Sequence, residues 1–313
     1  MTSAAPVKVL SITGWCRNGS TILGNILNEI PGVFHVGELH FLWKNAAGRG
    51  VNEQCGCGHK LVDCPFWSTI LPVGRPDGTT LEAHADTVIR RQLGNVRTRH
   101  TWQVLHRGLH NGEIRAHADL MTQIYRAVAE RSDSRVIVDT SKMPGEAAML
   151  ARLDGLTPYY VHLVRDPRAV AQSWSRPKEY VYAMSPGKST GYWSGFNLAS
   201  HAITRRYPQR SLFLRYEDFI AEPAATVDTL LRLCEIDPAS NPMTDRTVEL
   251  HSNHTVTGNP DRFNTGVTVI RPTDDLWRSA LPDSARRTAS VLSWPLSLRY
   301  GYLNGGAKSS GRG

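Results

Sequence analysis

The chain has 313 residues, of which 41% are hydrophobic and 20% are charged. This composition can form a buried core and is unlike that of an intrinsically disordered chain. No segment approaches the roughly 20 consecutive apolar residues that a membrane span needs. The excess of 36 Lys and Arg over 28 Asp and Glu gives a net charge of +8, which favours anionic partners. Because the N-terminus lacks the basic segment of a secretory signal and the five cysteines form no paired framework, we expect a cytoplasmic protein.

Short apolar segments rich in β-branched residues alternate with helical patterns along the chain. The first predicted strand is Val7–Thr13, and four more are predicted at 33–38, 135–139, 159–164 and 211–216. Helices are predicted at 20–30, 116–131, 145–153, 167–175, 192–207 and 224–234. Near-continuous apolar strands that alternate with helices are typical of a parallel sheet covered by helices on both faces. We therefore expect an α/β fold, with a single domain spanning residues 1–313.

Two segments lack this alternation. Residues 44–115 are predicted to form a loop-rich or partly helical insertion after the second strand, and the Gly- and Ser-rich tail at 304–313 is predicted to be flexible. At the end of the insertion and just beyond it, residues 88–117 hold six Arg and four His against one acid. This stretch either lines an acceptor pocket or forms a solvated basic helix face.

Cys55, Cys57 and Cys64 lie close together in the insertion, with His59 between them. These residues are candidate ligands of a structural zinc ion, but a disulfide involving Cys64 is also open, and free buried thiols are the default. We expect no metal ion in the chemistry of the protein.

A Gly-containing loop at residues 13–23, TGWCRNGSTIL, follows the first strand and opens a helix. Four residues separate Gly14 from Gly19, as in the G-x-x-x-x-G-K-[ST] nucleotide loop, but Ser20 stands where that motif has Lys. Backbone N–H groups at a helix N-terminus can hold an anion, and Arg17 supplies a positive charge from within the loop. The loop therefore predicts a site for a phosphoryl or sulfuryl group. An ordinary strand-helix turn is the alternative.

A second anion site is predicted where the strand at 159–164 ends. Arg165 follows that strand, at the edge where open α/β sheets bind ligands. Asp166 is placed to cap the next helix, and the Ser173 hydroxyl lies on the same side of that helix. Arg165 and Ser173 could together hold a phosphate monoester. Alternatively, Arg165 and Asp166 form a structural ion pair.

Together these two segments resemble the sulfotransferases that use 3′-phosphoadenosine 5′-phosphosulfate (PAPS), in particular the bacterial branch related to protein-tyrosine sulfotransferases. The resemblance covers roughly residues 7–302 and implies a P-loop-type parallel β-sheet. It implies that the 3′-phosphate is held by Arg165 and Ser173. It also implies that the 5′-phosphosulfate is bound by Arg17, Asn18, Gly19, Ser20 and Thr21.

The same resemblance assigns roles in sulfuryl transfer. Glu38 takes the position of the general base that accepts the proton of the acceptor hydroxyl, with His40 as the alternative base. Lys142 would stabilise charge on the departing phosphate, and Arg17 would assist at the transferring group. Ser141, beside Lys142, is a possible second hydroxyl ligand.

Two later segments are implied to contact the nucleotide. Tyr216, at the end of the fifth strand, would pack on the adenine. In the loop at 254–263, Asn259 and Arg262 would approach the 3′ side of the nucleotide. His254 lies in the same loop, and the sequence leaves open whether it contacts the nucleotide or the acceptor.

These observations predict a PAPS-dependent sulfotransferase that acts on a hydroxyl group of a small-molecule acceptor. A P-loop nucleotide kinase or other NTPase with a degenerate loop is the alternative, although Asp139 is its only candidate magnesium ligand. A polyanion-binding protein is a third possibility, but no nucleic-acid-binding motif supports it. The sequence identifies neither the acceptor nor the oligomeric state.

Overall fold

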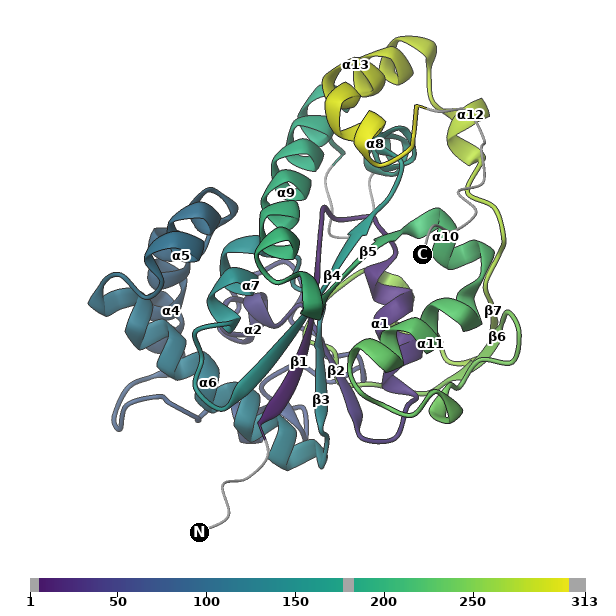
Figure 1. Cartoon of the computed structure of the whole chain (residues 1–313). Helices are drawn as coiled ribbons and strands as arrows, with labels where there is room; N and C mark the ends of the chain where they lie inside the picture. The colour runs from purple at the N-terminus through teal and green to yellow at the C-terminus, as the bar shows by residue number, and fades with distance from the viewer. Residues whose placement is uncertain (1–5, 177–182, 304–313) are drawn as a thin grey trace.

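The computed structural model describes residues 6–176 and 183–303, so the predicted flexible tail lies outside the described residues. A five-stranded sheet runs through the centre of the molecule in the order β2-β3-β1-β4-β5, and all neighbouring strands are parallel (Figure 1). The predicted parallel sheet is confirmed. Its strands are β1 (Val7–Thr13), β2 (Val33–Gly37), β3 (Val136–Asp139), β4 (Leu156–Val164) and β5 (Ser211–Arg215).

The strand order reverses at β1, which pairs with β3 on one side and with β4 on the other. In open α/β sheets, ligands bind beside the carboxyl ends of the strands at such a reversal. The second and fifth strands each end one residue earlier than predicted, so Glu38 and Tyr216 stand just beyond the sheet. Because all five strands are parallel, the predicted site residues that follow them lie at the same carboxyl edge of the sheet. These residues are Arg17, Glu38, Lys142, Arg165 and Tyr216.

Helices cover both faces of the sheet (Figure 1). On one face, α1 (Ser20–Asn28), α10 (Tyr216–Ala221) and α11 (Pro223–Leu233) contribute to one apolar cluster with β1, β3 and β4. The other face is covered by α2 (Leu42–Ala46), α3 (Trp67–Ile70), α4 (Leu81–Asn95), α5 (Thr101–Arg107), α6 (Gly112–Ser132), α7 (Pro144–Leu150) and part of α9 (Pro186–Arg206). The insertion is partly helical with long loops, as predicted, and its side chains enter the same core as Val9 and Ile137 of the sheet.

The C-terminal third contains elements that the sequence pattern did not predict. An antiparallel pair is formed by β6 (Thr247–Leu250) and β7 (Gly266–Val269). Two further helices, α12 (Leu276–Ala280) and α13 (Asp283–Arg299), follow it and lie near α8 (Pro167–Ser175). Four-residue strands carry little periodic signal, and α13 contains Pro295, which normally ends a helix.

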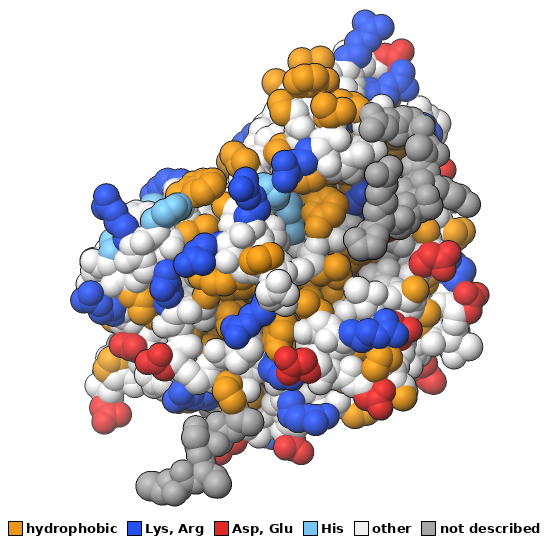
Figure 2. Space-filling model, in the orientation of Figure 1, with side chains coloured by type: hydrophobic (Ala, Val, Ile, Leu, Met, Phe, Trp, Pro, Cys, Tyr) orange, Lys and Arg blue, Asp and Glu red, His pale blue; other side chains and the backbone are white. Residues whose placement is uncertain are grey.

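The basic residues of the insertion lie mainly on its outer surface. Figure 2 shows Lys, Arg and His side chains over the α4–α6 side of the molecule.

The tryptophans of the region after β2 differ in burial. Trp43 and Trp67 are fully buried in the core, whereas Trp102 is exposed. Among residues 6–176 and 183–303, no helix combines the length and the apolar character that crossing a bilayer requires.

Candidate functional site

A cavity of about 500 Å³ opens at the carboxyl edge of the sheet. This volume lies within the range of small-molecule and cofactor sites. Most of the predicted site residues line it, namely Arg17, Gly19, Ser20, Thr21, Glu38, Lys142, Arg165, Ser173, Tyr216 and Asn259. Asn18 and Arg262 are buried and do not line it. No residue of the basic stretch at 88–117 lines it either.

The loop between β1 and α1 is fixed against β4. Gly14 has a φ of +122°, and a Cβ there would lie 2.2 Å from the carbonyl oxygen of Leu163, so only glycine fits. The Asn18 amide donates to the same oxygen at 2.8 Å, and its own oxygen accepts from the Ser20 N–H at 3.3 Å. Asn18 therefore holds the loop in shape from behind, rather than facing the cavity.

The N-terminus of α1 faces the cavity with a glycine at its cap. Gly19 adopts a left-handed conformation with a φ of 87° and supplies no capping side chain. The first N–H groups of a helix have no intrahelical acceptor, and together with the helix dipole they favour an anion. The geometry confirms that the Gly-containing loop joins a strand to a helix at the edge of the sheet.

Replacing Gly19 by Ala is expected to disturb the cavity more than the same change at an open glycine. A Cβ at Gly19 would lie 2.3 Å from the Tyr216 ring, whereas at Gly78 it would meet nothing within 4 Å. Both glycines have positive φ, so G78A carries the backbone strain of about 1–3 kcal/mol without the collision. Thermal unfolding should therefore show a clearly larger loss of stability for G19A. Equal losses would contradict the proposed packing of Tyr216 on the loop.

Arg17 presents a partly buried cation to the cavity. Its backbone has a φ of 70°, an uncommon conformation for a residue with a side chain. The guanidinium lies 5.0 Å from the centre of the Trp174 ring, and its Nη1 donates to the Asn259 side-chain oxygen at 3.4 Å. Its Nη2 is buried and has no hydrogen-bond partner among the described residues. A buried guanidinium nitrogen in this position is suited to an anionic ligand.

Arg165 joins the two predicted anion sites. Its Nη1 donates to the backbone oxygen of Arg17 at 2.9 Å, and its guanidinium lies 4.9 Å from the centre of the Tyr216 ring. Its Nε and Nη2 bind both carboxylate oxygens of Asp274, at 2.6 and 2.5 Å. The guanidinium thus faces the early glycine loop, while two of its nitrogens are paired with the Asp274 carboxylate.

Asp166 does not pair with Arg165, so that alternative is wrong. Asp166 instead caps α8 by accepting from the Arg168 N–H at 2.8 Å, as predicted. It also forms an ion pair with the Arg168 guanidinium, with a closest distance of 2.6 Å. Arg165 therefore lines the cavity and pairs with Asp274 instead.

Glu38 and Lys142 form an ion pair on another wall of the cavity, since the Lys142 Nζ donates to Glu38 Oε1 at 2.7 Å. The same Nζ donates to the Thr140 carbonyl at 2.6 Å. Lys142 is almost fully buried and has a φ of 57°. Burial lowers the pKa of Lys142, but the charge of Glu38 outweighs this effect and raises the pKa above its ordinary value. Lys142 is therefore an ammonium ion at neutral pH.

Gly37 turns the chain so that Glu38 reaches the cavity. It has a φ of +73°, and a Cβ there would lie within 3 Å of Thr255 and Val256. The Val256 N–H donates to the Val36 oxygen at 2.9 Å, which places the segment 254–256 directly against β2. The position of Glu38 thus depends on a segment more than 200 residues later in the sequence.

Three residues that the sequence offered as an alternative base or ligand make their contacts inside the protein, away from the cavity. His40 Nδ1 lies 2.8 Å from Glu146 Oε2, and Ser141 Oγ accepts from the His40 N–H at 3.0 Å. The Asp139 carboxylate accepts from the Tyr125 hydroxyl at 2.6 Å and from the Ser141 N–H at 2.7 Å. None of His40, Ser141 and Asp139 lines the cavity. These groups support the loops that carry Glu38 and Lys142.

The buried cluster of His40, His117 and Glu146 predicts a pH dependence of stability. Burial lowers the pKa of His40, but Glu146 outweighs it and raises the pKa above its ordinary 6.5. Burial raises the pKa of Glu146, whereas the two histidines outweigh it and bring the pKa below its ordinary 4.5. The contribution of His40 is therefore present below pH 6.5 and lost as pH rises through its higher folded pKa. That of Glu146 is present above pH 4.5 and lost as pH falls.

The variant E146Q tests this dependence. In the parent protein, the unfolding midpoint should fall as pH rises above about 6.5 and through the higher folded pKa of His40, because His40 then loses its proton. In E146Q this fall should be clearly smaller, although the variant is less stable at every pH. The measurement is thermal unfolding in a pH series, and identical slopes for the two proteins would contradict the assignment.

Arg262 does not reach the cavity, in contrast to the prediction. Its side chain is 1% exposed. It donates to the Thr255 oxygen at 3.0 Å, to the Gln54 oxygen at 2.9 Å and to the Asn52 side-chain oxygen at 3.2 Å. A buried guanidinium needs such acceptors, and backbone oxygens provide most of them here. Arg262 therefore connects the loop at 254–263 to the insertion.

Three residues of the site carried no recognised signal in the sequence. Trp174 lies under the Arg17 guanidinium, Lys44 lines the cavity from α2, and Asp274 pairs with Arg165. Trp174 follows Ser173 directly, so the helix that predicted Ser173 also contained it. Lys44 and Asp274 lie in segments with no motif, and only the fold brings Lys44 to the cavity and Asp274 to Arg165.

Comparisons with known proteins agree with this architecture. The sequence profile of the sulfotransferase family matches residues 10–240. The structure resembles the sulfotransferase domain of the olefin synthase from Synechococcus PCC 7002, with 19% identity, a TM-score of 0.51 and coverage of 95% of this chain and 97% of that one. It also resembles the sulfotransferase domain from the curacin biosynthetic pathway, with 20% identity, a TM-score of 0.50 and coverage of 93% and 99%. No curated protein matches the chain significantly.

Proposed function

The chain belongs to the sulfotransferase family, and we propose that it transfers the sulfuryl group of PAPS to a hydroxyl group of a small-molecule acceptor. One observation carries this proposal beyond the family. Arg17 and the N-terminus of α1, Arg165, and the Glu38–Lys142 pair all border the same cavity. Two separate anion sites and a carboxylate in one cavity fit a donor with two phosphate positions and an acceptor that must lose a proton.

In the proposed complex, the α1 N-terminus and Arg17 hold the 5′-phosphosulfate, while Ser20 and Thr21 add hydroxyl donors. Arg165 and Ser173 hold the 3′-phosphate. For Arg165 to do so, the phosphate must replace or share its pairing with Asp274. Tyr216, between Gly19 and Arg165, is proposed to contact the adenine, and Asn259 to close the cavity from the opposite loop.

Glu38 is proposed to accept the proton of the acceptor hydroxyl as its oxygen attacks sulfur. A bond between that oxygen and sulfur forms while the bond from sulfur to the phosphate oxygen breaks, and the bisphosphate of adenosine leaves. An ammonium group has three N–H donors, and Lys142 uses two of them on Glu38 and Thr140. The third is proposed to stabilise the charge that develops on the departing oxygen, with Arg17 assisting at the transferring group.

The acceptor is proposed to occupy the part of the cavity bordered by Phe41, Val51 and Leu276, whose side chains are apolar. Phe41 lies three residues from Glu38, so an acceptor in contact with it would be close to the proposed base. This lining favours a small hydroxylated molecule with an apolar body. We also propose that the protein acts in the cytoplasm, because none of the five cysteines forms a disulfide.

The direct test is transfer of radiolabelled sulfate from PAPS to a panel of hydroxylated small molecules. We expect labelled product with at least one acceptor class, and we expect PAPS to raise the unfolding temperature. Stabilisation by ATP with magnesium, and none by PAPS, would instead support an NTPase.

A further inference from the structure

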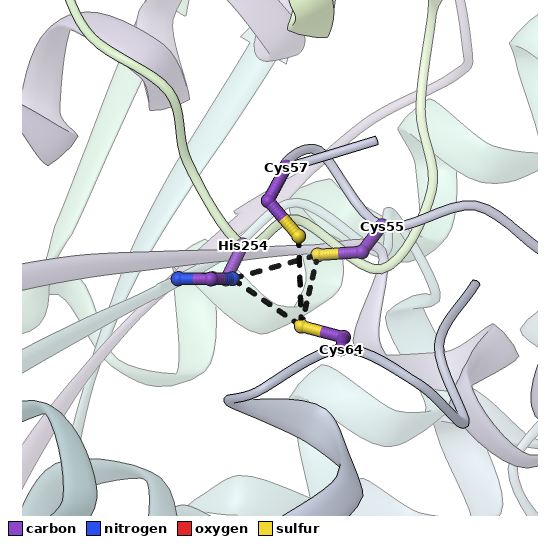
Figure 3. Close-up of side chains that lie close together, drawn as sticks. All are labelled: Cys55, Cys57, Cys64 and His254. Carbon is purple, nitrogen blue, oxygen red and sulfur yellow. Dashed lines mark hydrogen bonds between the residues drawn. The ribbon is translucent and has the colours of Figure 1, made fainter. Parts of the chain in front are cut away.

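Three cysteines of the insertion and one histidine of a distant loop converge on a common centre. Figure 3 shows the side chains of Cys55, Cys57, Cys64 and His254 pointing toward one another. Their sulfur and Nδ1 atoms all lie within 4.8 Å of one another. This cluster lies outside the cavity, and neither the family match nor the fold comparisons assign it a role.

We propose that Cys55, Cys57, Cys64 and His254 bind one structural Zn²⁺ ion. The histidine that the sequence offered, His59, is not part of the cluster and approaches only the Cys57 sulfur, at 3.6 Å. Three cysteines and one histidine are a common ligand set of structural zinc, and a site with four protein ligands leaves no open position for a substrate. The site would therefore stabilise the fold rather than carry out chemistry.

The distances between the ligand atoms fit a tetrahedral zinc site. With Zn–S bonds of about 2.3 Å and a Zn–N bond of about 2.0–2.1 Å, a tetrahedron has S···S edges of about 3.8 Å and S···N edges of about 3.6 Å. The sulfur of Cys64 lies 3.5 Å from that of Cys55 and 3.7 Å from that of Cys57. The His254 Nδ1 lies 3.7 Å from the Cys55 sulfur and 3.3 Å from the Cys64 sulfur.

The residues around the cluster hold these ligands in place. Trp67 donates its backbone N–H to the Cys64 sulfur at 3.5 Å and its indole N–H to the His254 carbonyl at 2.5 Å. The Phe66 ring stacks on the His254 imidazole, with centroids 5.4 Å apart. Cys55 and Cys64 are fully buried, while Cys57 is partly exposed and gives an ion a route of entry. On binding, the three thiols release three protons to solvent, and the site carries one net negative charge.

The proposed zinc would connect the insertion to a wall of the cavity. Cys55 and Cys64 belong to the insertion, whereas His254 begins the segment that packs against β2 and continues through Thr257 to Asp261. The Gly56 N–H donates to the Thr255 oxygen at 2.9 Å, which brings the same two segments together beside the cluster. Zinc would therefore fix the segment that supports Gly37 and Glu38.

The test is the metal content of the full-length protein, purified without chelators and without added metal. We expect about one Zn²⁺ per chain by elemental analysis, released when a mercurial reagent titrates the thiols. Exchange with Co²⁺ should give the visible absorption of a tetrahedral cobalt–thiolate site. Removal of zinc should also lower the unfolding temperature.

Matched variants identify the ligands. C64S and H254A should lose most of the bound zinc, while H59A and C234S should retain it, since Cys234 lies in a different apolar cluster. If C64S and H254A do not fold, the zinc content and the cobalt spectrum of the parent protein decide whether the site binds a metal ion. These measurements do not depend on sulfuryl transfer.

Three results would overturn the proposal: zinc below about a tenth of the chain concentration with no tetrahedral cobalt spectrum, an equimolar amount of another metal, or a disulfide among these cysteines in protein kept from oxidants. Zinc lost in H59A and kept in H254A would refute His254 as the fourth ligand.

Discussion

Replacing Glu38 by Gln is expected to lower the rate of sulfuryl transfer by about 10²–10⁴-fold, because an amide cannot accept the proton of the acceptor hydroxyl. The affinity for PAPS should change little. The substituted amide keeps a side-chain oxygen that can accept from the Lys142 ammonium, which donates to Glu38 at 2.7 Å in the parent protein. The measurement is single-turnover transfer at saturating PAPS, with nucleotide binding followed by calorimetry.

The matched control for E38Q is E249Q, which removes an exposed carboxylate from β6, away from the cavity. Its transfer rate should equal that of the parent protein. If E38Q also retained the parent rate, Glu38 would not be the base. If E38Q instead lost nucleotide binding and stability together, the Glu38–Lys142 pair would have a structural role only.

Replacing Arg165 by Ala is expected to give the largest loss of nucleotide affinity. Removing one partner of a buried, hydrogen-bonded charge pair costs about 2–5 kcal/mol, which corresponds to roughly 30-fold to several thousand-fold in Kd. The binding of the acceptor should be affected far less. Calorimetric titration of PAPS, or of adenosine 3′,5′-bisphosphate, into the two proteins measures the effect.

A variant of Asp274 distinguishes a direct contact between Arg165 and the phosphate from an effect of losing the Arg165–Asp274 ion pair. In D274N the partner of Arg165 loses its charge, although the asparagine oxygen can still accept from the guanidinium. We expect this variant to bind the bisphosphate as tightly as the parent protein or more tightly, because a competing carboxylate is gone. Comparable losses of nucleotide affinity in R165A and D274N would mean that Arg165 acts through its ion pair, and not as a phosphate ligand.

The sequence was sufficient to predict the parts of the site that follow local rules. The strand Val7–Thr13 and the loop after it are adjacent in sequence, so the position of Arg17 and Gly19 at the edge of the sheet followed from the pattern. The same holds for Arg165, which directly follows β4, and for the Asp166 cap of α8. Parallel strands place such ends at one edge, whatever the details of the connections.

The remaining parts depend on contacts between residues far apart in the chain. His254 joins cysteines about 190 positions earlier, as the separation from Cys64 shows. Asp274 meets Arg165 across 109 positions. Local periodicity does not reveal such pairings, so the sequence offered His59 as the histidine of the cysteine cluster and Asp166 as an alternative partner of Arg165. Arg262 was placed at the nucleotide because its loop resembles a nucleotide-binding loop of the family, whereas backbone oxygens of Thr255 in the same loop and of Gln54 in the insertion hold it inside the protein.

The most direct measurement of the central proposal compares two ligands that differ only in the 3′-phosphate. Adenosine 3′,5′-bisphosphate and adenosine 5′-monophosphate should be titrated into the parent protein under the same conditions. If the loop at Arg17 and the site at Arg165 bind two phosphates of one nucleotide, the bisphosphate should bind at least about 30-fold more tightly. Equal affinities of the two ligands would contradict the account.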